Sequence, residues 1–116
     1  MLSEVRQSAR GPYLDLSHLF SGGIFAFVTL RGFNGTDPEE LRGFLREMGH
    51  PVRLVHRVEQ VHSATVVEAS LAPCAADALV GSAPGEAVRV VTADCVPILL
   101  ASADGSRYAA VHAGWQ

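Results

Sequence analysis

The stretch ILLASADGSRYAAVH, residues 98–112, carries the strongest fold signal in this chain of 116 residues. Two apolar runs, residues 98–101 and 108–112, flank the dipeptide Asp104-Gly105. An Asp-Gly pair between two such runs is typical of a tight hairpin, because both residues tolerate the left-handed backbone that the turn requires. The stretch therefore predicts two antiparallel neighbouring strands and places β-sheet at the centre of the fold.

A second local signal lies further towards the N-terminus, in DPEELRGFLREMG, residues 37–49. Asp37 can cap a helix, Pro38 suits its first position, and Glu40 has the spacing of a capping box. Gly49 suits the residue that follows the last turn. Four apolar residues recur at helical spacing between these ends: Leu41, Phe44, Leu45 and Met48. This pattern predicts one amphipathic helix of about three turns.

The remaining apolar runs are short, rich in β-branched residues and separated by turn residues, which is typical of strands. They lie at residues 24–30, 53–58, 65–69, 78–80 and 87–92. Residues 1–20 show no clear period and are predicted to form an irregular arm. We expect one α+β domain over residues 1–116, with a mixed, mostly antiparallel sheet. One helix covers too little of such a sheet. We therefore expect the domain to be incomplete and to form a homo-oligomer.

Composition excludes several classes of protein. Hydrophobic residues make up 48% and charged residues 18%, which does not fit a disordered chain. A net charge of −3 argues against a nucleic-acid surface, and residues 16–30, the longest stretch without a charge, are too polar to span a membrane. Without lysine, Schiff-base chemistry at a side-chain amine is excluded. No signal peptide is visible, so we expect a cytoplasmic protein with Cys74 and Cys95 as free thiols.

Three predicted strands have a candidate metal ligand beside one end: His62, Cys95 and His112. Two imidazoles and a thiolate leave a fourth tetrahedral position open, as in catalytic zinc sites. Zinc lowers the pKa of a water in such a position towards neutrality. The spacing alone is a weak signal. A histidine at a strand end is more often a surface residue, and a cysteine such as Cys95 is more often a small core residue.

Four segments resemble the YfiH family, also called the multicopper polyphenol oxidase or laccase-domain family. They are EQVHSATVVEA (59–69), DALV (77–80), VRVVTADCVPILLA (88–101) and AAVHAGW (109–115). The resemblance implies a layered α/β sandwich with a metal site at His62, Cys95 and His112. It implies a purine nucleoside phosphorylase that acts with phosphate on adenosine, inosine and methylthioadenosine, and that also deaminates adenosine. Zinc is the implied metal, and copper-dependent phenol oxidation is also attributed to the family.

The chain departs from the family pattern in two places. Gln116 stands where the family continues with arginine, and the family's C-terminal half is absent. Near the N-terminus only Thr29-Leu30-Arg31-Gly32 resembles the family's Thr-Arg-Gly-Gly turn, so Arg31 is a candidate phosphate ligand with a solvated strand end as its alternative. Asp94, next to Cys95, is a candidate for orienting a ligand or carrying a proton, although adjacent strand residues point to opposite faces.

Two other interpretations stay open at this point. In the first, Cys95 is a nucleophile activated by His112 in a metal-independent amidohydrolase. That interpretation leaves His62 without a role. In the second, the chain is a truncated, non-catalytic binding fragment of the family. Metal content separates the first from a zinc enzyme, and a phosphorolysis assay separates the second.

Overall fold

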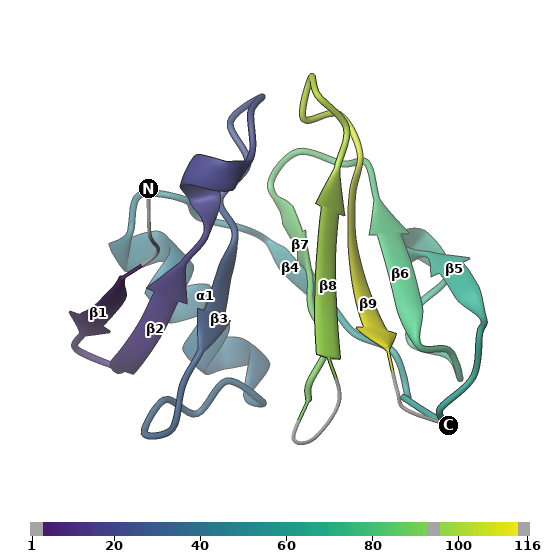
Figure 1. The fold of residues 1–116 in the computed structure, drawn as a ribbon, viewed down its shortest axis with the longest axis horizontal. Coiled ribbons are helices and arrows are strands. Elements are labelled where there is room, and N and C mark those ends of the chain that lie inside the picture. Colours follow the sequence, from purple (N-terminus) through teal and green to yellow (C-terminus); the bar gives the residue numbers. More distant parts are fainter. Residues whose placement is uncertain (1–3, 93–95, 114–116) are drawn as a thin grey trace.

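The computed structural model describes residues 4–92 and 96–113, which form three small sheets and one α-helix (Figure 1). The α+β class is confirmed, whereas the expected single sheet is divided into three. The first sheet is antiparallel: β1 (Val5–Ser8), β2 (Gly11–Asp15) and β3 (Phe27–Thr29). The second pairs β4 (Leu54–His56) in parallel with β7 (Glu86–Val88). The third has the order β5 (Val66–Glu68), β6 (Ala78–Gly81), β9 (Tyr108–Ala113) and β8 (Val96–Ala101).

The predicted hairpin is confirmed by the pairing of β8 with β9. The register is antiparallel and sets Ile98 opposite Val111. The turn is closed by the carboxylate of Asp104, which accepts hydrogen bonds from the backbone and the hydroxyl of Ser106 and from the hydroxyl of Ser102. These donors lower the pKa of Asp104 to about 2. The local signal in residues 98–112 thus decides the centre of the third sheet.

The predicted helix is α1 (Pro38–Glu47). The Asp37 side chain accepts a hydrogen bond from the backbone N–H of Glu39, as expected for an N-cap. Gly49 follows the helix with φ +82°, and His50 N–H donates to the carbonyl of Leu45, which is the Schellman form of C-terminus. Within the described part of the chain, no helix is long and apolar enough to cross a membrane.

The prediction of an irregular arm is wrong for residues 5–15, which form the β1–β2 hairpin. Pro12 in β2 obscures the strand pattern, because proline cannot donate to a sheet. Contacts with α1 hold the hairpin in place. Tyr13 is buried against Phe44 with ring centroids 4.8 Å apart. Arg10 forms ion pairs with Glu40 and Glu47, so Glu40 serves this contact where the sequence suggests a capping box.

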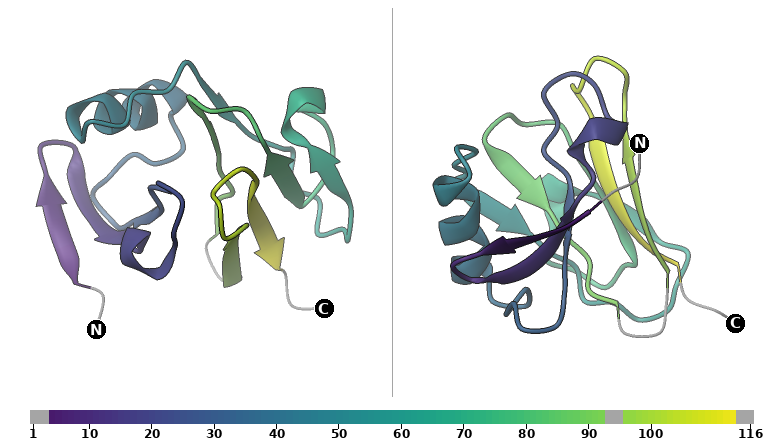
Figure 2. Two further views of the ribbon diagram at one scale, coloured as in Figure 1. Left: turned by 90° about the horizontal axis from the view of Figure 1, so that it is seen from above. Right: turned by 60° about the vertical axis from the view of Figure 1, so that its left-hand side comes forward.

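Over residues 4–92 and 96–113, the core consists of two separate apolar clusters. The first cluster lies between the first sheet and α1, and contains Tyr13, Phe33, Leu41, Phe44 and Leu45. The second cluster lies against the third sheet, and contains Val58, Ala69, Ala76 and Leu79. The β4–β7 pair lies between the two halves of the molecule (Figures 1 and 2). Consecutive residues of β7 serve different clusters, because Ala87 packs against the first and Val88 against the second.

The loop that precedes β3 contacts the β8–β9 turn and joins the two halves at a second place. Ser21 Oγ donates to the carbonyl of Ala103 at 2.6 Å. Gly22 has φ +72°, and a Cβ on it would overlap the backbone of Asp104. Gly23 has a similar φ of +78°, but no atom lies within 4 Å of the position of its Cβ. Substitutions at the two glycines therefore distinguish the cost of the left-handed backbone, which both share, from the cost of steric overlap, which applies only to Gly22.

Gly23→Ala is expected to lower the free energy of unfolding by about 1 kcal/mol, the cost of an L-residue in the left-handed region. Gly22→Ala is expected to lower it by about 2–3 kcal/mol, because overlap with Asp104 adds to the same backbone cost. Urea denaturation of both variants measures the difference. Equal losses in the two variants would show that the loop does not pack on the turn.

Candidate metal centre

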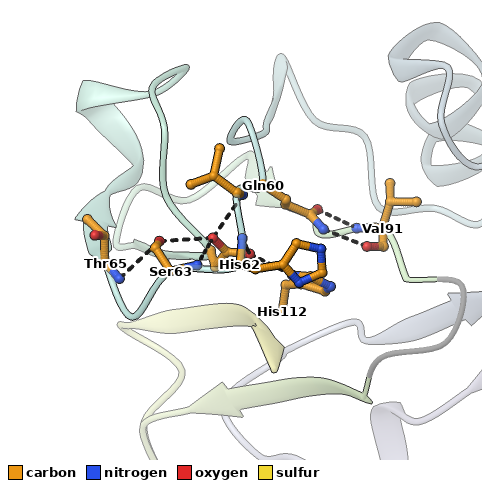
Figure 3. A network of polar contacts seen from close by, with 8 residues as sticks. Gln60, His62, Ser63, Thr65, Val91 and His112 are labelled. Atoms are coloured by element: carbon orange, nitrogen blue, oxygen red, sulfur yellow. Dashed lines mark hydrogen bonds and ion pairs between the residues drawn. The ribbon is translucent and has the colours of Figure 1, made fainter. Parts of the chain in front are cut away.

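A tight turn over Val61, His62 and Ser63 follows β4 and precedes β5 (Figure 3). His62 has φ +58°, a left-handed conformation in which histidine is more common than most residues. The backbone N–H groups of the three residues all donate to the carboxylate of Asp77, at 2.8–3.1 Å. Successive N–H groups that converge in this way form a concave anion-binding turn. The residue His62 itself is exposed.

Asp77 lies immediately before β6 and has only 2% of its surface exposed. Burial by itself raises the pKa of this carboxyl group. Hydrogen bonds from the ring of His112, from the turn and from the Ser63 hydroxyl outweigh that effect and hold the pKa well below its usual range. Asp77 is therefore ionised at neutral pH, although it is buried.

His112 lies on β9, is 6% exposed and binds the same carboxylate. Its Nδ1 lies 2.6 Å from Oδ2 of Asp77. An ionised carboxylate can only accept hydrogen bonds, so Nδ1 carries the proton and a neutral His112 has its lone pair on Nε2. The rings of His62 and His112 meet edge to face, with centroids 5.1 Å apart (Figure 3). The structure thus brings together two of the three predicted metal ligands.

Gln60 connects this turn to the segment that leads to the third predicted ligand. Its amide donates to the carbonyl of Val91 and accepts from the N–H of the same residue, at 2.6 and 2.8 Å. Asp94 and Cys95 lie outside the described residues. β8 begins at Val96, the residue after Cys95 in sequence, and Pro97 is the register partner of His112. Val91, before Cys95 in sequence, is therefore hydrogen-bonded to the segment that contains His62. Pro97, after Cys95 in sequence, is paired with the strand that contains His112.

The other predicted site residue is placed elsewhere. Arg31 is exposed, just beyond β3 in the first sheet, and forms no hydrogen bond or ion pair with His62, Asp77 or His112. A cavity of about 580 Å³ lies between β3 and the strands β7 and β8, and neither histidine lines it. Among the described residues, no group of three His, Cys, Asp or Glu side chains could hold a metal ion.

Asp77 is the residue of the candidate site that sequence reasoning missed. It stands in the DALV segment that carries part of the family resemblance, but nothing nearby in sequence marks it as a ligand partner. Its side-chain partners are 14 to 16 residues and 35 residues away along the chain. The pairing of β6 with β9 brings Asp77 to His112, and the pairing of β5 with β6 brings it to the turn.

The fold and the site together define an α+β protein in which two imidazoles meet beside a mixed sheet, and in which one buried carboxylate binds the ring of one histidine and the backbone of the other. The chain belongs to the multi-copper polyphenol oxidoreductase laccase family, whose profile matches residues 37–116. This confirms the resemblance seen in the sequence.

Curated relatives of the chain are named purine nucleoside phosphorylases. One from Synechocystis is 36% identical over 115 residues, which cover 90% of this chain and 41% of the relative. One from Deinococcus radiodurans is 45% identical over 120 residues, which cover 92% of this chain and 47% of the relative. A crystal structure of a Neisseria meningitidis protein has a TM-score of 0.55 and 28% identity, over 97% of this chain and 50% of that one. The chain thus spans about half the length, or less, of these proteins.

Proposed function

We propose that His62, Cys95 and His112 hold a zinc ion. The observation that carries this proposal is the orientation of His112, whose Nδ1 is bound by Asp77 so that Nε2 is left as a ligand atom. A carboxylate behind a ligating histidine is the usual outer-shell arrangement at zinc. His62 lies against the same ring, and a thiolate at Cys95 would complete a donor set that suits a borderline-soft ion. When bound, zinc supplies a Lewis acid and can activate water or polarise a substrate group.

The reaction proposed for this site is the phosphorolysis of purine nucleosides, supported by the names of the Synechocystis and Deinococcus relatives. A phosphate oxygen forms a bond to the anomeric carbon of the ribose while the bond from that carbon to the purine nitrogen breaks. The leaving purine keeps the bonding electrons and takes up a proton. Asp94 is proposed to carry that proton, and Arg31 is proposed to bind phosphate through its guanidinium group.

The test combines metal content with product analysis. The purified chain is expected to contain about one zinc per chain, as a single three-ligand site requires. With inosine and phosphate it is expected to form hypoxanthine and ribose 1-phosphate, slowly if substrate contacts come from the part of the relatives that this chain does not span. His62→Asn is the variant that tests the imidazole of His62 as a metal ligand. Asparagine lacks the imidazole but tolerates the left-handed backbone of residue 62, so the turn is kept.

Zinc with no ribose 1-phosphate, at any substrate concentration up to saturation, would favour the binding-fragment interpretation. Turnover of an amide substrate without metal would favour the Cys95 amidohydrolase. The expected deamination of adenosine, the use of adenosine and methylthioadenosine, copper-dependent phenol oxidation, a homo-oligomer and a cytoplasmic location stay predictions for this chain.

A further inference from the structure

The two oxygens of the Asp77 carboxylate accept hydrogen bonds from different groups. Oδ1 accepts from the N–H of Val61 and from the N–H and hydroxyl of Ser63, so it closes the turn. Oδ2 accepts from the backbone N–H of His62 and from Nδ1 of His112, at 3.1 and 2.6 Å. One oxygen atom therefore touches both histidines of the candidate centre, although these lie on different elements.

We propose that Asp77 is the positioning residue of the metal centre: through Oδ2 it sets the tautomer of His112 and the place of His62 together. The proposal rests on the proposed metal centre and adds to it a residue outside the ligand set. Asp77 acts only through the two histidines, because its two oxygens are already occupied by five hydrogen bonds.

The backbone of Asp77 supports this role. Its carbonyl accepts from the N–H of His112 at 2.7 Å, and its N–H donates to the carbonyl of Thr65 at 3.1 Å. The backbone of Asp77 is thus tied to β9 and to the residue before β5, independently of the contact between its carboxylate and the His112 ring. A side chain fixed at this point can hold the ring of His112 and the backbone of His62 in one relative position, which a merely turn-closing residue such as Ser63 does not do.

The test compares Asp77→Asn with Ser63→Ala. Asparagine has the size of aspartate but no charge, and it brings N–H donors where the turn also presents donors. Zinc affinity is expected to fall by about 10–100-fold in Asp77→Asn, the usual effect of losing an outer-shell partner. Ser63→Ala removes only one donor to Oδ1 and leaves Oδ2 unchanged, so its zinc affinity is expected to stay within about threefold, below that outer-shell range.

A second readout does not depend on metal. In the metal-free wild-type chain, nitrogen NMR of the imidazoles is expected to show neutral His112 protonated on Nδ1. Protonation on Nε2 would overturn the proposal, as would a folded Asp77→Asn variant with wild-type zinc affinity. If the wild-type chain fails to bind zinc, the proposed metal centre fails, and the Nδ1 readout then decides on Asp77 by itself.

Discussion

Phe44→Ala should lower the free energy of unfolding by about 3–5 kcal/mol, the usual cost of removing a large buried aromatic ring. Phe44 lies on α1, has 0% of its surface exposed and is at the centre of the first cluster. Its ring contacts four aromatic rings, with centroids 4.8 to 6.2 Å away: Tyr13, Phe25, Phe27 and Phe33. Alanine leaves a cavity that rings from three different segments cannot fill together. Urea denaturation followed by circular dichroism measures the loss.

Leu71→Ala is the control for that measurement. Leu71 is an apolar residue of similar size, but it is 69% exposed, so its truncation should change the free energy of unfolding by less than about 0.5 kcal/mol. Similar losses in the two variants would contradict the packing described for the first cluster.

Cys95→Ser should remove most of the zinc, with an affinity loss larger than the about 10–100-fold expected when an outer-shell partner is lost. The reason is chemical, because a neutral hydroxyl is a poor substitute for a thiolate at zinc. Zinc measured after dialysis gives the stoichiometry. Cobalt(II) in place of zinc gives a visible spectrum in which sulfur-to-cobalt charge transfer reports the thiolate directly.

Cys74→Ser is the matched control, because Cys74 is a free, half-buried cysteine that none of the proposed roles requires. It should keep its zinc and its cobalt spectrum. Full zinc retention in Cys95→Ser would exclude Cys95 as a ligand and leave the two histidines with a different third partner.

Local signals in the sequence were sufficient for α1 and for the β8–β9 hairpin. In both, the decisive residues (Asp37 and Gly49, Asp104 and Gly105) act on backbone within a few positions of themselves. The β1–β2 hairpin and the division into three sheets could not be predicted in this way. They depend on contacts such as Arg10 with Glu47, which join residues 37 positions apart.

The candidate site shows the same limit. The residue types at positions 62 and 112 suggested metal ligands, and the structure brings these two histidines together. The carboxylate that orients them was missed, because an aspartate before a buried strand has no recognisable pattern until β6 and β9 are paired. The available sequence signal was weaker: an acidic residue directly before an apolar run within the family-like segments, here DALV, marks Asp77 as worth attention.

The β4–β7 pair, with Ala87 on one cluster and Val88 on the other, has a thermodynamic consequence. Two small cores that are joined by one pair of strands can unfold as two cooperative units. The two units are then coupled by the free energy of the contacts that this strand pair makes with both cores. In sequence, Asp77 lies between Ala76 and Leu79 of the second cluster. A ligand that binds the two histidines therefore stabilises the folded state of the second unit directly. The first unit is stabilised only through its contacts with the second, which are made by β4 and β7 and by the loop before β3 at the β8–β9 turn. Ligand binding can therefore divide the melting of one small chain into two steps.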